Sequence, residues 1–452
     1  MRVHFIAIGG AAMHNMAIAL HKKGFEVSGS DDEIFDPSKS KLEKYNLLPP
    51  AYGWFPEKIN DKLDAIILGM HARKDNPELL KAQELGLKIF SYPEYIYSQC
   101  KDKTRVVIGG SHGKTSITAM VLHVLNYFNM NFDYMVGAQL EGFETMVKLS
   151  DAPIVILEGD EYLSSPINLS PKFLWYKPHI AVLTGIAWDH INVFPTFENY
   201  VEQFDLFAQS IEEGGYLFYY NGDKHLNNIA LKQNKINCKA YDTPNHVIDN
   251  GITYLIDEDK NKLELNVFGE HNLQNIEAAK NICFQLGISY NAFNLAIGSF
   301  SGAAKRLEKL VSQKNYSAFK DFAHSPSKLK ATVNAVKGQF KTRKVVAAVE
   351  LHTFSSLNKK FLGEYAGTMD EADVACVYYS HHTIEHKKLE PISEKEVKTA
   401  FQNENLNVFT SSEELQAFLK AEDYNNAVLL LMSSGNFDGV NLLEFAQEVA
   451  PN

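Results

Sequence analysis

The sequence contains few cysteines, no long apolar run and no excess of basic residues, and each absence excludes a class of protein. The four cysteines include no CxxC pair, so neither a disulfide framework nor a zinc site is expected. No window approaches the roughly 18 apolar residues of a membrane-spanning helix. The net charge of −11 argues against nucleic acid as a bulk partner, because that binding depends on neutralising phosphates.

What is present is an ordinary globular composition in a long chain. Its 452 residues, 45% of them hydrophobic and 22% charged, predict roughly two to four domains with their own cores. Met1 leads directly into an apolar run, without a basic leader segment. We therefore expect a cytoplasmic protein with no membrane contact, and no obligate protein partner is evident.

The most informative stretch is a glycine-rich turn at residues 109–116, which reads GGSHGKTS. The apolar run before it predicts a buried strand, and apolar residues recur at helical spacing after it. Such a turn cradles a nucleotide triphosphate: its backbone N–H groups face the phosphates, Lys114 neutralises charge, and Thr115 can hold Mg²⁺. The expected nucleotide-binding residues are Gly110, Ser111, His112, Gly113, Lys114, Thr115 and Ser116. Ile108 replaces the first glycine of the strict motif, so an ordinary strand-to-helix turn is the alternative.

The chain is predicted to form three α/β domains. Residues 1–100 carry strand candidates at 3–8, 25–27, 65–68 and 88–90 and predict a Rossmann-like domain. Residues 101–300 predict a central domain like those of P-loop ATPases, with a mostly parallel sheet that includes strands at 153–157, 180–184 and 216–220. Residues 301–452 predict a second Rossmann-like domain with strands at 317–319, 345–349, 374–377 and 427–431.

Two clusters of polar residues follow predicted strands of the central domain, where α/β proteins usually keep their chemistry. Glu158 begins an acidic cluster directly after one strand, and a carboxylate there is an expected metal ligand. The alternative is a solvated acidic turn. Asp189 and His190 follow the next strand and can bind a metal or orient a substrate, although a lone Asp-His pair is common and is equally compatible with a structural role.

A third cluster, GEHNLQN at residues 269–275, precedes a helix-like segment that extends to about residue 298. Asn272 and Asn275 are three positions apart and share one helix face, from which their amides can read the edge of a base. The alternative is that Asn272 caps the helix N-terminus.

The order of these motifs resembles the Mur ligase family over essentially the whole chain. The phosphate loop is followed by Glu-x-Asp-Glu, Asp-His, Gly-x-His-Asn-x-x-Asn and, at residues 321–326, DFAHSP. The first domain is similar to the uridine-nucleotide-binding domain of members that act on UDP-N-acetylmuramate. The matching residues are Gly9, Gly10, Ala11, Ala12, Met13, Ser30, Asp31 and His71. By itself the glycine pair is weak, because GxGxxG is absent.

The resemblance implies an ATP-dependent amide ligase that activates a carboxylate as an acyl phosphate and releases ADP and phosphate. Lys114 would contact the β- and γ-phosphates, Thr115 and Glu158 one Mg²⁺, and His190 a second. His271, Asn272 and Asn275 would contact adenine. Asp321 would reach the ribose. Arg306, just past the second domain junction, would meet phosphate when the domains close, with a hinge salt bridge as its alternative.

Two members of the family compete as the best match. Murein peptide ligases join UDP-N-acetylmuramate to a recycled tripeptide, L-alanyl-γ-D-glutamyl-meso-diaminopimelate, and the alternative member joins L-alanine during peptidoglycan biosynthesis. Residues 35–38, 161–162, 172–178 and 433–439 are more similar to the first, so we expect the peptide as acceptor, bound by the third domain. The sequence departs from the family at Gly185, Asn192 and Ser325. It also lacks an arginine beside His352, which leaves the acceptor-binding residues open.

Overall fold

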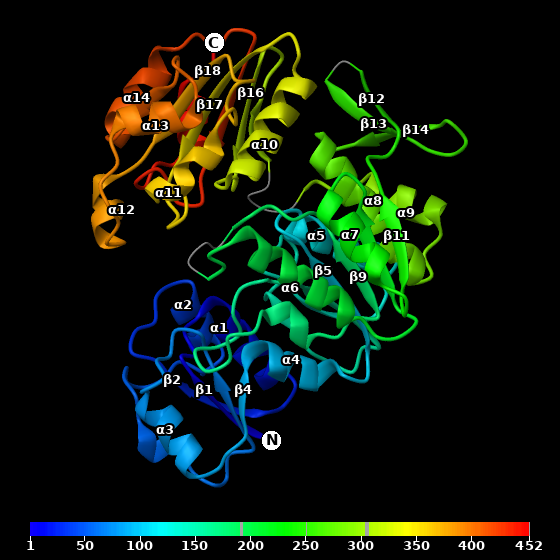
Figure 1. Cartoon of the computed structure of the whole chain (residues 1–452), viewed down its shortest axis with the longest axis vertical. Helices are drawn as coiled ribbons and strands as arrows, with labels where there is room; N and C mark the ends of the chain where they lie inside the picture. The colour runs from blue at the N-terminus through cyan, green and yellow to red at the C-terminus, as the bar shows by residue number, and fades with distance from the viewer. Residues whose placement is uncertain (190–192, 250, 303–306, 452) are drawn as a thin grey trace. The chain divides into compact units, whose positions relative to one another are not determined.

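The structure is a computed structural model that describes residues 1–189, 193–249, 251–302 and 307–451 (Figure 1). The described chain divides into two compact units. The first comprises residues 1–186, 193–241 and 278–289, and the second comprises the remaining described residues. Within these ranges, no helix combines the length and apolar character needed to cross a membrane.

The first unit begins with a four-stranded parallel sheet in the order β2-β1-β3-β4. Every residue of β3 is buried, because helices cover both faces of a parallel sheet. The strands are β1 (Arg2–Ile6), β2 (Glu26–Ser30), β3 (Ala65–Leu68) and β4 (Ile89–Ser91). The helices are α1 (Ala11–Lys22), α2 (Ser38–Lys44), η1 (Pro56–Lys58), α3 (Pro77–Glu84) and α4 (Tyr92–Cys100). The glycine and acidic residues after β1 and β2 therefore lie at one edge of this sheet.

The same unit contains a seven-stranded sheet in the order β11-β10-β9-β5-β8-β6-β7, in which only β7 is antiparallel to its neighbour. Its strands are β5 (Thr104–Gly109), β6 (Phe132–Met135), β7 (Val147–Lys148), β8 (Ile154–Glu158), β9 (Ile180–Leu183), β10 (Tyr216–Tyr220) and β11 (Asn237–Tyr241). Its helices are α5 (Lys114–Tyr127), η2 (Lys172–Trp175), α6 (Phe197–Gln209) and α7 (Lys224–Lys232). β5 is central, which places the glycine-rich turn between the ends of β8 and β9.

The second unit contains a small antiparallel sheet, formed by β12 (His246–Asp249), β13 (Ile252–Ile256) and β14 (Lys262–Leu265). It also contains a six-stranded sheet in the order β15-β16-β20-β17-β18-β19, parallel except for β15. These strands are β15 (Glu308–Ser312), β16 (Tyr316–Asp321), β17 (Lys344–Glu350), β18 (Val374–Tyr378), β19 (Asn407–Phe409) and β20 (Ala427–Met432). The helices are α9 (Tyr290–Ile297), α10 (Pro326–Gln339), α11 (Lys359–Leu362), η3 (Gly363–Tyr365), α12 (His381–His386), α13 (Glu394–Phe401), α14 (Ser412–Ala421) and α15 (Leu442–Glu448).

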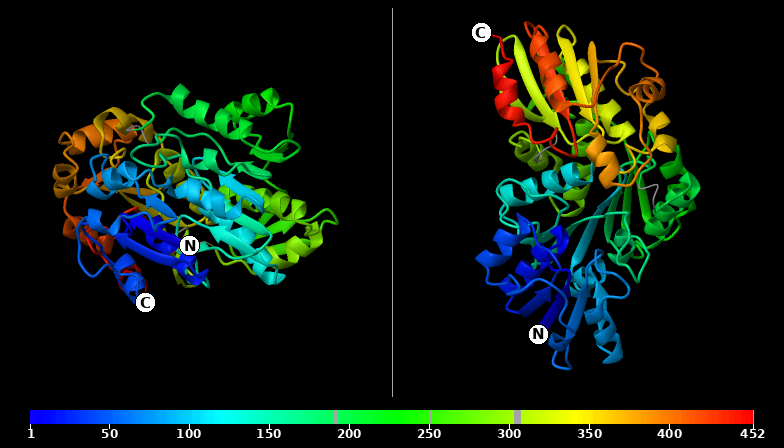
Figure 2. Two further views of the ribbon diagram at one scale, coloured as in Figure 1. Left: turned by 90° about the horizontal axis from the view of Figure 1, so that it is seen from below. Right: turned by 90° about the vertical axis from the view of Figure 1, so that its left-hand side faces the viewer.

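Helices cover both faces of this six-stranded sheet (Figures 1 and 2). Val345, Ala347 and Val349 face a core shared with α10, α11 and α13. Val346 and Ala348 face the opposite core, shared with α14 and α15. Successive strand residues point to opposite faces, so a strand buried on both sides is a continuous apolar run.

The predicted fold class is confirmed: the chain is α/β with mostly parallel sheets. The helix-like segment that begins near residue 271 is two helices, α8 (Glu270–Gln285) and α9. They separate at Gly287, whose φ of +89° is left-handed and cannot continue a helix. The two predicted strands at 65–68 and 216–220 have the bounds of β3 and β10.

Candidate functional site

The glycine-rich turn is held tightly between β5 and β9. Its Gly110 has a φ of +125°, and a Cβ added there would lie 2.0 Å from Oγ1 of Thr184. The amide of Ser111 donates to the carbonyl of Gly185 over 3.0 Å, and the hydroxyl of Thr184 donates to the carbonyl of His112. Glycine is the residue that permits this backbone at position 110, because a side chain there would collide with Thr184.

Lys114 opens α5 and folds back over the turn. Its Nζ donates to the carbonyl of Gly110 over 2.6 Å and lies 2.7 Å from Oε2 of Glu161, which is buried. Tyr200 of α6 donates to the other oxygen of Glu161 over 3.0 Å. Because that bond uses the only proton of the tyrosine hydroxyl, the hydroxyl of Ser111, 3.0 Å away, donates to Tyr200.

The carboxylates around Lys114 keep it charged. Burial opposes the charge, but Glu161, Asp160 and Glu158 together hold the pKa of Lys114 above its usual value. A permanent cation fixed at the mouth of a backbone cradle is suited to the phosphates of a nucleotide.

Thr115 and Glu158 form the oxygen-donor pair of the site. The hydroxyl of Thr115 donates to Oε1 of Glu158 over 2.9 Å, and the amide of Gly137 donates to Oε2 over 2.8 Å. Both side chains are buried. A hydroxyl and a carboxylate are ligands that Mg²⁺ accepts, usually together with phosphate oxygens and waters. The described residues contain no cluster of three or more His, Cys, Asp or Glu suited to a metal, so this pair would supply only part of a coordination shell.

Of the further residues predicted to act beside Thr115 and Glu158, the structure describes only some. Asp189 belongs to the second unit. His190, Arg306 and Asn192 lie outside the described residues, so the roles expected of His190 and Arg306 stay predictions. The departure at Gly185 has a structural reason: its φ is +144°, and an added Cβ would lie 2.8 Å from Cε1 of His112.

The residues expected to bind the sugar nucleotide follow three adjacent strands of the first sheet. Gly9 and Gly10 lie between β1 and α1, whose first three residues are Ala11, Ala12 and Met13. Ser30 ends β2, Asp31 follows it, and His71 is exposed in the loop after β3. The amide of Gly9 donates to Oδ2 of Asp31 over 2.7 Å. The structure therefore brings these residues to one sheet edge.

Burial raises the pKa of Asp31 to about 6, although the hydrogen bond from Gly9 opposes the rise. A Cβ added at Gly9 would lie 2.9 Å from the same carboxylate. The turn after β1 and the acid after β2 are thus packed against each other, as in a nucleotide-binding edge of a doubly wound sheet.

The residues expected to contact adenine and ribose lie in the second unit. His271, Asn272 and Asn275 are on the first turns of α8, and Asn272 donates to the carbonyl of Phe268 over 2.8 Å. The alternative that Asn272 caps the helix is wrong, because α8 begins before it, at Glu270. Burial lowers the pKa of His271 to about 4, so its ring is neutral at physiological pH.

Asp321 ends β16 and holds the backbone that follows Arg306. One carboxylate oxygen accepts from the amide of Leu307, and the other accepts from the amide of Ala323 over 2.7 Å. Its position at a strand end agrees with the expected edge location. Its contact with ribose stays a prediction.

Two residues of the site were not assigned a role from the sequence. Glu161 belongs to the acidic cluster after β8, but its partner Lys114 is 47 positions away. Tyr200 has no local signal, because a tyrosine on the apolar face of a helix is most often core. A search for a second carboxylate near the loop lysine would have found Glu161 but not Tyr200.

Known proteins match the chain along most of its length. Residues 2–104 match the Mur ligase family, catalytic domain, and residues 108–283 match the Mur ligase middle domain. A UDP-N-acetylmuramate–L-alanine ligase of Caldicellulosiruptor bescii is 31% identical over 386 residues, which cover 82% of this chain and 82% of that protein.

Two crystal structures share the fold. A UDP-N-acetylmuramate–alanine ligase from Thermotoga maritima aligns over 99% of this chain and 98% of its own, with a TM-score of 0.69 and 20% identity. A murein peptide ligase from Psychrobacter arcticus aligns over 100% of both chains, with a TM-score of 0.64 and 19% identity. At these identities the likeness establishes the three-domain α/β architecture.

Proposed function

This chain belongs to the Mur ligase family of ATP-dependent amide ligases, and from that membership we propose that it joins UDP-N-acetylmuramate to L-alanine. The acceptor follows from the curated relatives, of which the Caldicellulosiruptor bescii protein is one. They favour L-alanine over the tripeptide that the sequence motifs suggested. The peptide acceptor is therefore the second candidate.

The reaction needs an activated acid. A carboxylate resists attack by an amine because oxide is a poor leaving group. Transfer of the γ-phosphoryl group of ATP to a carboxylate oxygen gives an acyl phosphate and ADP. The amine then attacks the acyl carbon, phosphate leaves, and the nitrogen loses a proton to give the amide. The protein's part is positioning and charge neutralisation.

The observation that carries the proposal is the arrangement at the phosphate loop. Lys114 is a half-buried cation over the turn, and Thr115 and Glu158 present two oxygens 2.9 Å apart beside it. We assign Lys114 to the β- and γ-phosphates and the other two to Mg²⁺. When bound, Mg²⁺ would neutralise phosphate charge as the γ-phosphoryl group is transferred. The supporting groups Glu161 and Tyr200 would hold Lys114 and Ser111 in place.

The sugar nucleotide is assigned to the edge of the first sheet. Gly10 precedes α1 and makes no side-chain hydrogen bond to its first turn, and the start of a helix favours anions such as a diphosphate. Asp31 is placed where acids of doubly wound domains meet a ribose hydroxyl. ATP binding in the other sheet of this unit leaves this edge for the uridine nucleotide.

A specific observation keeps the tripeptide as second candidate. The segment at residues 433–439, which resembles the peptide ligases, packs on the buried carboxylate of Glu350 at the end of β17. The amide of Phe437 donates to Glu350 over 2.9 Å, and Ser433 donates to the same oxygen. His352 lies 3.4 Å from the other oxygen of Glu350. These groups lie in the domain that is expected to bind the acceptor.

The test is a phosphate-release assay with UDP-N-acetylmuramate, ATP and Mg²⁺ and either L-alanine or the tripeptide, with the product identified by mass spectrometry. We expect turnover and an alanyl product with L-alanine. Turnover with the tripeptide alone would move the assignment to the second candidate. No turnover with either acceptor would overturn the ligase assignment. The Lys114→Met variant measures the background.

A further inference from the structure

One segment of the first unit connects its two sheets. Residues 136–146 join β6 to β7, and we call them the β6–β7 segment. At its start, the amide of Gly137 donates to Oε2 of Glu158 over 2.8 Å. A Cβ added at Gly137 would lie 2.8 Å from Oε1 of Glu158, so the backbone lies directly against the proposed metal ligand.

The far end of the segment is held by the first sheet's helices. Glu144 lies 2.6 Å from Nζ of Lys22 on α1 and 3.0 Å from Nζ of Lys44 on α2, and it accepts from the hydroxyl of Tyr45. Two further bonds flank this cluster. Lys41 donates to Gln139 over 2.7 Å, and the amide of Met146 donates to Asn15 of α1 over 2.9 Å.

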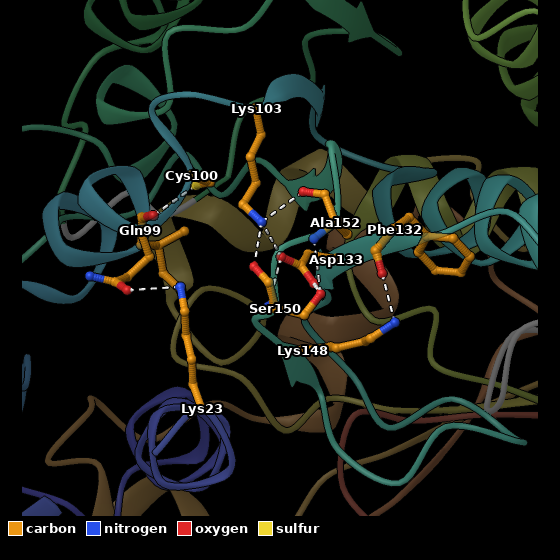
Figure 3. A network of polar contacts seen from close by, with 10 residues as sticks. Lys23, Gln99, Cys100, Lys103, Phe132, Asp133, Lys148, Ser150 and Ala152 are labelled. Atoms are coloured by element: carbon orange, nitrogen blue, oxygen red, sulfur yellow. Dashed lines mark hydrogen bonds and ion pairs between the residues drawn. The ribbon is translucent and has the colours of Figure 1, made fainter. Parts of the chain in front are cut away.

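The base of the segment is fixed by a buried ion pair (Figure 3). Lys103 lies 2.6 Å from Asp133 of β6 and also donates to the carbonyls of Ser150 and Ala152. Ser150 donates to Asp133 through its amide and its hydroxyl. Asp133 is fully buried, so β6 and the residues that follow β7 are held at one point.

The Glu144 cluster contacts the helix that carries proposed sugar-nucleotide residues. α1 begins with Ala11 and Ala12, while Asn15 and Lys22 of the same helix contact the β6–β7 segment. Hydrogen bonds from Lys22, Tyr45 and Lys44 lower the pKa of Glu144 to about 2, so the carboxylate is ionised throughout the neutral range.

We propose that Glu144 is a positioning residue that sets the uridine-nucleotide edge of the first sheet against Glu158 of the phosphate-loop site. The β6–β7 segment transmits this constraint, since one of its ends contacts Glu158 and the other contacts α1 and α2. The identity of the two bound nucleotides rests on the proposed function, whereas the contacts do not. Loss of the Glu144 charge would leave each nucleotide site intact but would make the position of one site relative to the other less fixed.

The test compares Glu144→Gln with Glu141→Gln, which removes an exposed carboxylate from the same segment. We expect Glu144→Gln to lower kcat/KM for UDP-N-acetylmuramate at least about fivefold, the lower end of typical coupling between sites. The Kd of an ATP analogue should change less than about twofold, and the control should match wild type in both. A purely structural defect would weaken ATP binding equally, and that result, or an unchanged kcat/KM, would overturn the proposal.

Hydrogen exchange keeps this test separate from the proposed function. Glu144→Gln should speed exchange of the amides of Gly137 and Met146 relative to Glu141→Gln in the protein without substrates. If wild type shows no ligase activity but this difference is found, the proposed function fails and the coupling stands. Equal exchange in the two variants would overturn the coupling whatever the activity.

Discussion

The ammonium of Lys114 lies 2.7 Å from a carboxylate oxygen of Glu161, and the other oxygen of that carboxylate accepts from Tyr200. One buried acid thus connects α5, the segment after β8 and α6 beneath the phosphate loop. A buried pair of this kind is a weak source of net stability, but removing one partner leaves the other charge buried and uncompensated. We therefore infer that the main role of the Lys114–Glu161 pair is to hold the ammonium group of Lys114 in position.

The first prediction concerns Glu161. Glu161→Gln keeps an acceptor for Tyr200 but leaves Lys114 without its closest counter-charge, so we expect a loss of about 3 kcal/mol in unfolding free energy. The matched control is Glu26→Gln, which breaks an exposed pair with Arg2 at 2.7 Å and should cost under about 1 kcal/mol. Differential scanning calorimetry measures both. Similar losses in the two variants would show that the Lys114–Glu161 pair contributes no more to the free energy of unfolding than an exposed pair does.

The second prediction concerns Lys114 itself. Lys114→Met removes the cation and should reduce phosphoryl transfer at least about 100-fold. It also leaves Glu161 buried without its charge partner, so the double variant Lys114→Met/Glu161→Gln should be more stable than the single variant yet equally inactive. Phosphate release and calorimetry separate the two effects. Near-normal activity in either variant would remove the phosphate-loop assignment.

The third prediction tests the crowding around Gly110. Gly110→Ala combines an unfavourable φ of +125° with a Cβ only 2.0 Å from Thr184. Gly53→Ala has a nearly equal φ of +128°, and the new Cβ would come no closer than 3.6 Å to a ring carbon of Phe55, an ordinary van der Waals contact. The control should cost about 1–2 kcal/mol for its backbone, and Gly110→Ala should cost about 1–3 kcal/mol more. Calorimetry on both variants gives the difference, and equal costs would contradict the close approach.

The fourth prediction concerns pH. The folded-state pKa of His271 is lowered to about 4 by burial, whereas an unfolded histidine titrates near 6.5. Between these values the unfolded chain binds a proton that the folded protein does not, so stability falls as pH falls from about 6.5 to about 4. Above this window the group contributes no pH dependence.

Two measurements check the predicted direction of this pH dependence. The imidazole NMR signal of His271, assigned by its loss in His271→Gln, should not shift between pH 8 and pH 5. The same variant should lose less stability on acidification than wild type, by about 2 kcal/mol at pH 5. A midpoint near 6.5 in the folded protein would show that the ring is solvated.

Local patterns in the sequence indicate part of the candidate site, and long-range packing adds residues that leave no local pattern. Lys114, Thr115 and Glu158 could be assigned because a strand, a turn and a helix each leave a signal within a few residues. Gly137 could not, since its importance lies in a bond to a residue 21 positions away across the sheet. The contact of Glu144 with Lys22 spans 122 positions and leaves no periodic trace in the sequence.

The α/β fold class could be predicted because its buried strands also leave a local pattern in the sequence. Continuous apolar runs identified most buried strands of the parallel sheets, because both faces of such strands are covered. The buried strand β6 was not predicted, since Asp133 interrupts its apolar run. The short edge strands β7 and β19 and the antiparallel strand β12, whose four residues are all exposed, have no such runs and were not predicted. Asn272 illustrates the limit of capping rules, since α8 starts at Glu270, three residues before the start that a cap at Asn272 would give.

The exposure of the Glu144 cluster implies an unequal response to salinity. Dissolved ions screen surface charges over about 8 Å at physiological ionic strength, whereas buried pairs are screened much less. The carboxylate of Glu144 is 54% exposed, while that of Glu161 is 2% exposed. Rising ionic strength should therefore weaken the contacts of Glu144 with α1 and α2 before it weakens the Lys114–Glu161 pair, so salt would loosen these helices while the loop lysine stays in place.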